Sequence, residues 1–387
     1  MNKTYFITGG TGFVGKNIVE AILNKSSDAK IKLLVRSCSG VSAVKRAEKT
    51  FGNIYNNQDV YKRIEVIEGN VTEDYFGLSK SEYECLTKTT KFIFHSAASV
   101  KFNLPLDQAY AINVKGTENL LKFASECHKN KILERYNHIS TAYVVGRQKQ
   151  LVSDFCENNF ANTYEATKNL AEKMIRQYCN AGLPATIFRP SIISGNSITG
   201  EIPTNCIVFI FILLLANERL PQIPCNSDTS LNIVPINYVI DLVLKISEMP
   251  EAIGNVYNIT REENISLPEV IEFLCQTLNT RVPKFVPIHQ SRTIPKKVLN
   301  SIETFIPYFE ESHHFDLSET LKLLGCKSFE PDDFKTGFMR MIKFCWDNKL
   351  LANNHKKHIV INSPNLPLYL TPKENEIQQK LIKRTIS

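Results

Sequence analysis

The sequence lacks a hydrophobic run long enough to span a membrane. Its longest apolar run, CIVFIFILLLA from Cys206 to Ala216, has eleven residues, whereas a membrane-spanning helix needs about 20. The run therefore predicts a buried helix. The alternative interpretation is a wall for an apolar substrate tail, or a patch that rests on a membrane surface.

Paired cysteines and blocks of basic residues are also missing. None of the ten cysteines forms a C-x-x-C pair, and the N-terminus does not resemble a signal peptide. We therefore expect reduced, mostly buried thiols in a cytoplasmic protein, with peripheral membrane contact left open. The formal charge of +7 is spread along the chain without a dense Lys/Arg block among aromatics. This distribution favours anionic small molecules over nucleic acid as partners, and we predict no metal site.

The chain is long enough, at 387 residues and 43% hydrophobic, to bury a large core. Its first half alternates apolar, strand-like runs with helical patterns. The strand-like runs are TYFIT, IKLLV, RIEVIEG, KFIFHSA, YNHIST and LPATIFRP. The helical patterns cover Val14–Leu23, Ala43–Phe51, Leu106–Cys127 and Tyr164–Cys179. Nearly continuous hydrophobic strands separated by amphipathic helices predict an α/β fold with a doubly wound parallel sheet of the Rossmann type.

After about residue 195 the alternation loosens. We predict helices over Val239–Ser247 and Leu267–Leu278, and a strand at NVYNIT. Residues 1–195 are interpreted as a Rossmann domain and 196–350 as a smaller, partly interleaved lobe that binds substrate. Residues 351–387 read as a polar, basic tail, whose last residues, ENEIQQKLIKRTIS, predict a surface helix.

Three glycines separate the first predicted strand from the first predicted helix. Gly9, Gly12 and Gly15 follow TYFIT at a spacing of three. Without a Cβ, each can turn tightly, let the backbone approach a pyrophosphate, or pack helix against sheet. The start of the helix then offers unpaired N–H groups to phosphates. A glycine triplet is common between strands and helices, but on the first strand of an alternating pattern it predicts a dinucleotide site.

The residue after the second predicted strand indicates which dinucleotide binds. An NAD site would place an acidic residue there to accept from the ribose hydroxyl. This chain has LLVRS instead, with Arg36 at that point. Arg46 could supply a second positive charge, or lie on a solvated helix face. We therefore predict NADP(H) as the cofactor of residues 1–195.

Candidate catalytic residues follow the fifth strand. Tyr164 and Lys168 are four residues apart on a predicted helix, so their side chains share one face. An ammonium near a phenol favours the phenolate, so we expect a lowered pKa for Tyr164. Ser140 and Thr141 end the strand in HISTAYVVG, and either hydroxyl could donate to a substrate oxygen.

At these residues the chain resembles the extended short-chain dehydrogenases/reductases. The features that this chain shares with them are TGGTGFVG, a hydroxyl-bearing strand end and Y-x-x-x-K. Finer motifs resemble the branch that holds fatty acyl-CoA reductases and the terminal thioester-reductase domains of carboxylic acid reductases and peptide synthetases. These motifs are LLVR, HSAASVKF, INVKGTENLL, HISTAYVVG, NTYEATKNLAE, FRPSII and NIVPINYVIDLV. The resemblance covers roughly residues 3 to 280.

The resemblance implies a role for residues at the end of each strand. It implies that the cofactor's phosphates contact the loop of Gly9, Thr11, Gly12, Phe13, Val14 and Gly15, and that Arg36 and Arg46 bind the 2′-phosphate. It also implies that Asn70 and Val71 lie beside the adenine, that Ala97 and Ala98 line the cofactor after the fourth strand, and that Pro190 and Ser191 border the nicotinamide. Asn70 stands where the family usually has aspartate, so a hydrogen-bond acceptor is kept and the negative charge is lost.

The catalytic side of the resemblance implies acyl thioester reduction. Thr141, with Ser140 as second choice, and Tyr164 would bind the carbonyl oxygen, while Lys168 would hold the nicotinamide ribose and Asn113 would support the site. The product would be an aldehyde, and the residues do not decide whether a second reduction gives the alcohol. They also leave open whether the acyl group arrives on CoA or on a separate acyl carrier protein. They indicate no oligomeric state.

Two alternatives to this function stay open. One is a related enzyme that acts on a sugar nucleotide, a steroid or a flavonoid. The other is a protein that binds NADP without turnover. The fold alone does not separate them, because the superfamily hosts many chemistries on one scaffold.

Overall fold

The structure is a computed structural model. It describes residues 3–55, 61–146, 159–287, 302–310 and 312–351, together with Lys296 and Asn300. The tail after residue 351, with its predicted helix, lies outside the described residues. None of the helices in the described part is long and apolar enough to cross a membrane.

A parallel sheet forms the centre of the protein, and within the described residues it has seven strands. In spatial order these are β11 (Val256–Ile259), β6 (Ala185–Pro190), β5 (Arg135–Ile139), β4 (Phe92–His95), β1 (Thr4–Thr8), β2 (Lys30–Val35) and β3 (Ile64–Glu68). Every neighbouring pair is parallel. The chain order reverses between β1 and β4, where such folds hold their ligands. The predicted doubly wound fold is confirmed.

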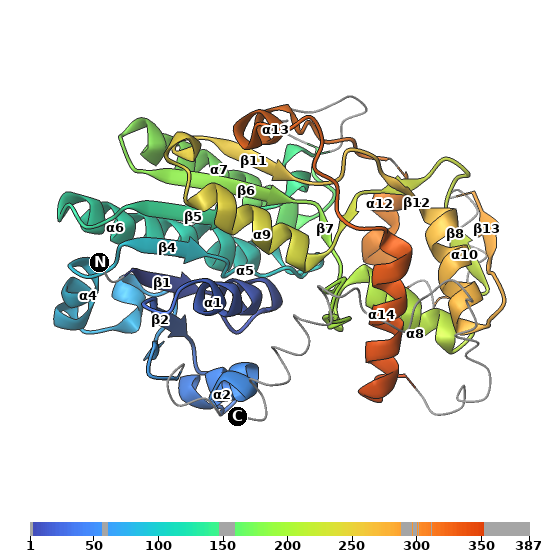
Figure 1. Ribbon diagram of the computed structural model, residues 1–387, viewed down its shortest axis with the longest axis horizontal. Helices are drawn as coiled ribbons and strands as arrows, with labels where there is room; N and C mark the ends of the chain where they lie inside the picture. The colour runs from blue at the N-terminus through green and yellow to red at the C-terminus, as the bar shows by residue number, and fades with distance from the viewer. Residues whose placement is uncertain are drawn as a thin grey trace.

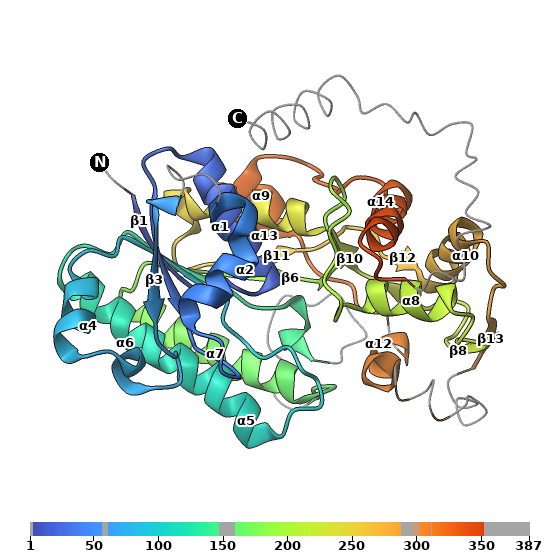
Figure 2. The same ribbon diagram turned by 90° about the horizontal axis from the view of Figure 1, so that it is seen from below.

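Helices cover both faces of the sheet, as Figure 2 shows. One face carries α1 (Phe13–Lys25), α2 (Ala43–Tyr55) and α9 (Ile236–Ser247), and the other carries α4 (Lys80–Thr87), α6 (Gly116–Lys129) and α7 (Thr163–Asn180). Each face buries its own apolar cluster. Strands buried on both faces must be apolar throughout, which explains why the strand-like runs were readable in the sequence.

The predicted helix from Leu106 to Cys127 is present with one irregular turn. It consists of α5 (Leu106–Tyr110), a π-helical turn η2 (Ala111–Lys115) and α6. The π turn inserts an extra residue around Asn113, which is buried. Such turns are frequent at functional sites.

A smaller lobe lies beyond the carboxyl ends of the strands, on the right in Figure 1. Its helices are α8 (Ile207–Ala216), α10 (Leu267–Leu278), α12 (Ile306–Glu310) and α14 (Phe334–Asp347). Its short strands are β8 (Gln222–Pro224), β9 (Ser230–Leu231), β12 (Ile265–Ser266) and β13 (Lys284–Val286). Helix α8 is the apolar run, and most of its side chains are buried in the lobe's own core, which confirms the buried helix.

The two parts of the protein share chain segments. Helix α9 and strand β11 come from beyond residue 195 yet pack on the large sheet, as does α13 (Ser318–Leu324). Short strands β7 (Ile192–Ile193) and β10 (Ile233–Val234) pair with each other between the sheet and the lobe.

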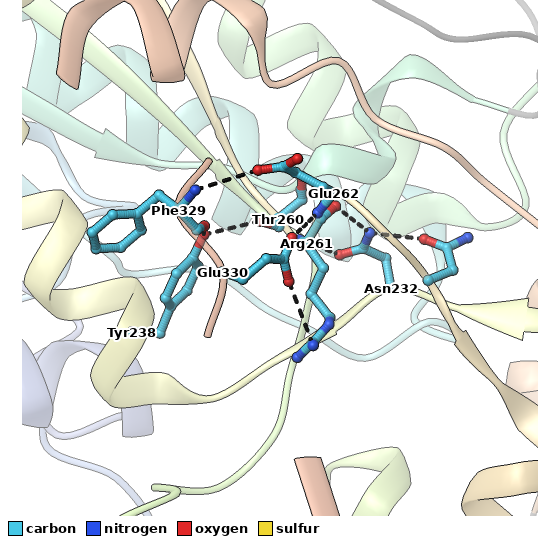
Figure 3. A network of polar contacts seen from close by, with 8 residues as sticks. Asn232, Tyr238, Thr260, Arg261, Glu262, Phe329 and Glu330 are labelled. Carbon is cyan, nitrogen blue, oxygen red and sulfur yellow. Dashed lines mark hydrogen bonds and ion pairs between the residues drawn. The ribbon is translucent and has the colours of Figure 1, made fainter. Parts of the chain in front are cut away.

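A polar network fastens the segment before α14 to the end of β11 (Figure 3). The Tyr238 hydroxyl donates to the carbonyls of Thr260 and Phe329 at 3.1 and 2.8 Å. Arg261 pairs with Glu330 at 3.4 Å. These bonds hold the chain where it passes from the sheet back to the lobe.

The described cysteines form no disulfide, as expected. Their burial is more varied than expected. Cys127, Cys225, Cys275 and Cys345 are buried, whereas Cys38 and Cys85 are exposed because they lie on loop or helix surfaces.

A buried ion pair joins α7 to β6. Arg189 and Glu172 are 1% and 0% exposed, and the guanidinium Nη2 lies 2.6 Å from Glu172 Oε2 while Nε donates to both carboxylate oxygens. We expect Glu172→Gln to lower the free energy of unfolding by about 3–5 kcal/mol, because it leaves the arginine charge buried without compensation. Urea denaturation measures this change. Asp347→Asn, which breaks the exposed pair with Lys343, is the control and should change little.

Candidate active site

A cavity of about 240 Å³ opens at the carboxyl ends of β1, β2, β3 and β4. Most of the predicted cofactor residues line this glycine-loop cavity. They are Gly9, Thr11, Gly12, Arg36, Arg46, Asn70, Val71, Ala97 and Ala98. Phe13, Val14 and Gly15 begin α1 beside it and do not line it. Parallel strands end at one edge, so residues far apart in sequence meet here.

The glycine loop has no room for side chains at Gly9 and Gly15. Gly9 has a φ of +73°, and a Cβ on it would lie 2.5 Å from the Ala97 backbone nitrogen. A Cβ on Gly15 would lie 2.3 Å from the Gly9 carbonyl oxygen. Helix α1 starts after Gly12 without a side-chain cap, so no side chain competes for its first N–H groups. This bare loop and uncapped helix start suit the phosphates of a dinucleotide.

Arg46 connects the second strand to the glycine loop. Its Nη1 donates to the Arg36 carbonyl, and its Nη2 donates to the Thr11 hydroxyl at 3.1 Å. The solvated helix face is therefore not the arrangement found. In the loop after β3, Asn70 accepts from the Thr72 backbone nitrogen at 3.2 Å, a bond within the turn that lines the cavity.

The predicted catalytic pair lies in the first two turns of α7. This helix is capped at its N-terminus by Asn162, whose side chain accepts from the Glu165 backbone nitrogen. The Thr141 hydroxyl at the end of β5 lies beside the Tyr164 phenol and acts to lower its pKa. Lys168 Nζ donates to the Ile139 carbonyl at 2.7 Å and lies 3.0 Å from His138 Nε2. Helix α7 and the end of β5 thus bring these functional groups together.

The expected lowering of the Tyr164 pKa is wrong for this structure. Burial and the neighbouring Glu165 charge raise the pKa of the phenol, and the Thr141 hydroxyl opposes them only in part. The Lys168 ammonium is bonded to β5 instead. Burial lowers the pKa of Lys168 to about 8, against the opposing charge of Glu172. The tyrosine is therefore a protonated phenol at neutral pH.

The remaining predicted residues surround this pair. Asn113 donates to the Thr167 hydroxyl at 2.9 Å and accepts from the Ser99 backbone nitrogen at 2.8 Å, so it ties the loop after β4 to α7. Pro190 ends β6. The hydroxyls of Ser140 and Ser191 are buried and have no hydrogen-bond partner among the described residues.

An aromatic wall beside Tyr164 was missed by the sequence reasoning. The Phe102 ring lies 5.8 Å from the Tyr164 ring and 5.6 Å from that of Tyr308 on α12. The Tyr308 hydroxyl donates to Glu165 Oε1 at 2.5 Å, which attaches the lobe to the first turn of α7. Tyr308 belongs to no recognised motif, and Phe102 ends the HSAASVKF motif without any role having been assigned to it. Only the fold brings them to the site.

Comparison with known proteins agrees with this geometry. The family model described as male sterility protein, a NAD-binding model, matches residues 7–243. Aldehyde reductase lnbA of Aspergillus flavus is 26% identical over 72% of this chain and 28% of its own length. Fatty acyl-CoA reductase wat of Drosophila melanogaster is 30% identical over 63% of this chain and 53% of its own length. The chain thus spans between about a quarter and a half of these relatives.

The likeness extends to a solved structure. The terminal R domain from the myxalamid PKS-NRPS biosynthetic pathway superposes with a TM-score of 0.77 and 24% identity, covering 90% of this chain and 92% of that one. At this identity the likeness shows the shared fold. The family match covers more than half of the chain and includes the glycine loop, the end of β5 and the start of α7. The chain belongs to the male sterility protein family of NAD-binding domains, which confirms the branch resemblance seen in its motifs.

Proposed function

We propose that the protein is an NADPH-dependent reductase that converts an acyl thioester to an aldehyde. The observation that carries the proposal is that the hydroxyl of Thr141 lies beside the phenol of Tyr164. They lie at the sheet edge that also holds the glycine-loop cavity. Two adjacent hydroxyls are suited to donate to a carbonyl oxygen as negative charge develops on it.

The residues around the glycine-loop cavity support NADPH rather than NADH. Arg36 stands at the end of β2, where an acidic residue would favour the ribose of NAD, and Arg46 is bonded to its carbonyl. Two guanidinium groups suit a 2′-phosphate. When bound, this cofactor supplies the hydride that reduces the carbonyl.

The chain's own residues handle the oxygen and its proton. Tyr164, protonated at neutral pH, gives its phenolic proton to the carbonyl oxygen while Thr141 donates a second hydrogen bond. Lys168, one helical turn away, has its ammonium bonded to the Ile139 carbonyl and would hold the nicotinamide ribose when the cofactor is bound. With a thioester, the reduced carbon is a hemithioacetal. Its C–S bond then breaks to release a thiol and the aldehyde.

The smaller lobe supports an aliphatic acyl group as the substrate. Helix α8 adds a strongly apolar element to the lobe, and its Ile210 and Leu213 are only partly buried. The relatives named fatty acyl-CoA reductase and aldehyde reductase favour the same chemistry. In this proposal residues 1–195 bind the cofactor and 196–350 bind the acyl thioester, delivered on CoA or on an acyl carrier protein.

We expect the purified protein to oxidise NADPH only when an acyl-CoA is added. The assay follows the cofactor's absorbance with acyl-CoAs of several chain lengths and, in parallel, the thiol released. The thiol count separates aldehyde from alcohol as product, because the alcohol consumes twice as much NADPH per thiol. The free fatty acids are the matched control, since they keep the chain and lack the thioester.

Two outcomes would contradict the proposal. Oxidation or epimerisation confined to sugar nucleotides would assign the site to another branch of the superfamily. Tight NADPH binding without turnover on any thioester, whether on CoA or on a carrier protein, would indicate a binding protein.

A further inference from the structure

Two histidines that the proposed mechanism does not use lie inside the sheet. His95 on β4 and His138 on β5 face each other in register, and their ring centroids are 5.1 Å apart. Their side chains are 1% and 0% exposed. Imidazoles buried this deeply need hydrogen-bond partners, and those partners indicate whether the ring is neutral and which nitrogen carries the proton.

The hydrogen bonds of His95 make it a neutral imidazole. The Thr117 hydroxyl donates its only proton to the Asn113 carbonyl at 2.6 Å, so toward His95 Nε2, at 3.1 Å, it acts as the acceptor. His95 Nδ1 then accepts from the Thr8 hydroxyl at 2.7 Å. Burial and the Lys168 charge lower the pKa of His95 to about 3, which agrees with this neutral form.

His138 makes a different contact, because its Nε2 lies 3.0 Å from Lys168 Nζ. An ammonium can only donate, so a charged Lys168 requires His138 Nε2 to accept and its proton to sit on Nδ1. Nδ1 has no partner among the described residues. Burial and the charge of Lys168 hold the pKa of His138 well below its usual range, so the ring stays neutral.

We propose that His138 is a positioning residue that holds the Lys168 ammonium at the end of β5 and keeps it protonated. Its role in the reaction rests on the proposed function, but its effect on the lysine does not. Nζ has two acceptors among the described residues, the Ile139 carbonyl and His138 Nε2. The lysine side chain is 3% exposed, so each of these acceptors replaces water that the ammonium has lost.

The other charged and titratable groups around Lys168 do not accept a hydrogen bond from its ammonium. The charge of Glu172, one turn further on α7, raises the pKa of Lys168, but the Glu172 carboxylate is bonded to Arg189. His95 is bonded to two threonines, Tyr164 lies beside Thr141, and the Tyr136 ring stacks on that of His138 with the centroids 6.4 Å apart. Loss of the His138 acceptor therefore leaves one backbone carbonyl for a buried ammonium. Its pKa should fall further, because a hydrogen bond to the charged form has been removed.

The pKa of Lys168 tests this inference directly, without cofactor or substrate. In protein labelled with ¹³C at lysine Cε, the chemical shift reports titration, and Lys168→Met assigns the resonance. We expect a midpoint near pH 8 in the natural chain, well below that of exposed lysines. His138→Phe keeps a ring without the acceptor and should lower the midpoint by about one pH unit. His138→Gln, which restores an acceptor oxygen, should recover most of it.

Two controls separate this effect from damage to the core. Tyr136→Phe alters the same strand at a buried hydroxyl that has no hydrogen-bond partner among the described residues, and it should leave the midpoint unchanged. His138→Leu is the second apolar variant if the phenylalanine does not fold, as judged by circular dichroism. A folded apolar variant whose Lys168 midpoint equals that of the natural chain would overturn the proposal.

The pH dependence of thioester reduction provides a second, independent test of the role of His138. If Lys168 must be charged, activity falls above its pKa, and this basic limb should move to lower pH in His138→Phe and return in His138→Gln. A shifted midpoint in the spectra together with no thioester reduction by the natural chain would refute the proposed function and leave the role of His138 standing.

Discussion

Tyr164→Phe is expected to lower kcat for thioester reduction by about 10²–10⁴-fold, the usual contribution of a positioned general acid. The variant removes one oxygen from a helix whose packing it leaves intact. Because the phenol is the proton donor, the loss should appear in kcat, while the dissociation constant of NADPH should change little. Steady-state kinetics and cofactor titration measure the two quantities separately.

Tyr178→Phe is the matched control for this prediction. It makes the same change on the same helix, near its other end and away from Thr141. We expect its kcat to equal that of the natural chain. A Tyr164→Phe variant that keeps full activity would show that the proton comes from another group, with Thr141 or a water molecule as the next candidates.

The architecture could be predicted because the same pattern, an apolar strand followed by an amphipathic helix, recurs along the sequence. Buried parallel strands must be apolar and must end at a common edge, so the residue after each strand could be assigned to the site. Arg36, Ala97 and Thr141 each follow a strand, and each lies at that edge. The π turn at Asn113 was missed, because one inserted residue hardly alters a helical period over twenty positions.

The electrostatics of the site were not predictable in the same way. The spacing of Tyr164 and Lys168 correctly placed both on one helix face, but the pKa of a phenol depends on what buries it. Phe102 and Tyr308, which come from a loop and from the smaller lobe, pack in this region of the site. No local pattern indicates either contact. The same holds for His138, whose partner became clear only from the structure.

The cofactor preference gives the second large effect. Arg36→Ala and Arg46→Ala are each expected to weaken NADPH binding by about 10–100-fold, the value of one charge-assisted hydrogen bond to a phosphate. The affinity for NADH should change far less after Arg36→Ala, because that side chain would meet only the 2′-phosphate. Fluorescence titration with both cofactors gives the ratio.

The two arginines should differ in their effect on NADH. Arg46 also holds Thr11 of the glycine loop and the Arg36 carbonyl, so its loss loosens the loop that any dinucleotide would contact. We therefore expect Arg46→Ala to weaken NADH as well, though less than NADPH. Lys45→Ala removes the same charge from the adjacent position of α2, outside the glycine-loop cavity, and should alter neither affinity. Equal losses for both cofactors in Arg36→Ala would remove the argument for a 2′-phosphate site, because a charge that recognises this phosphate must distinguish the two cofactors.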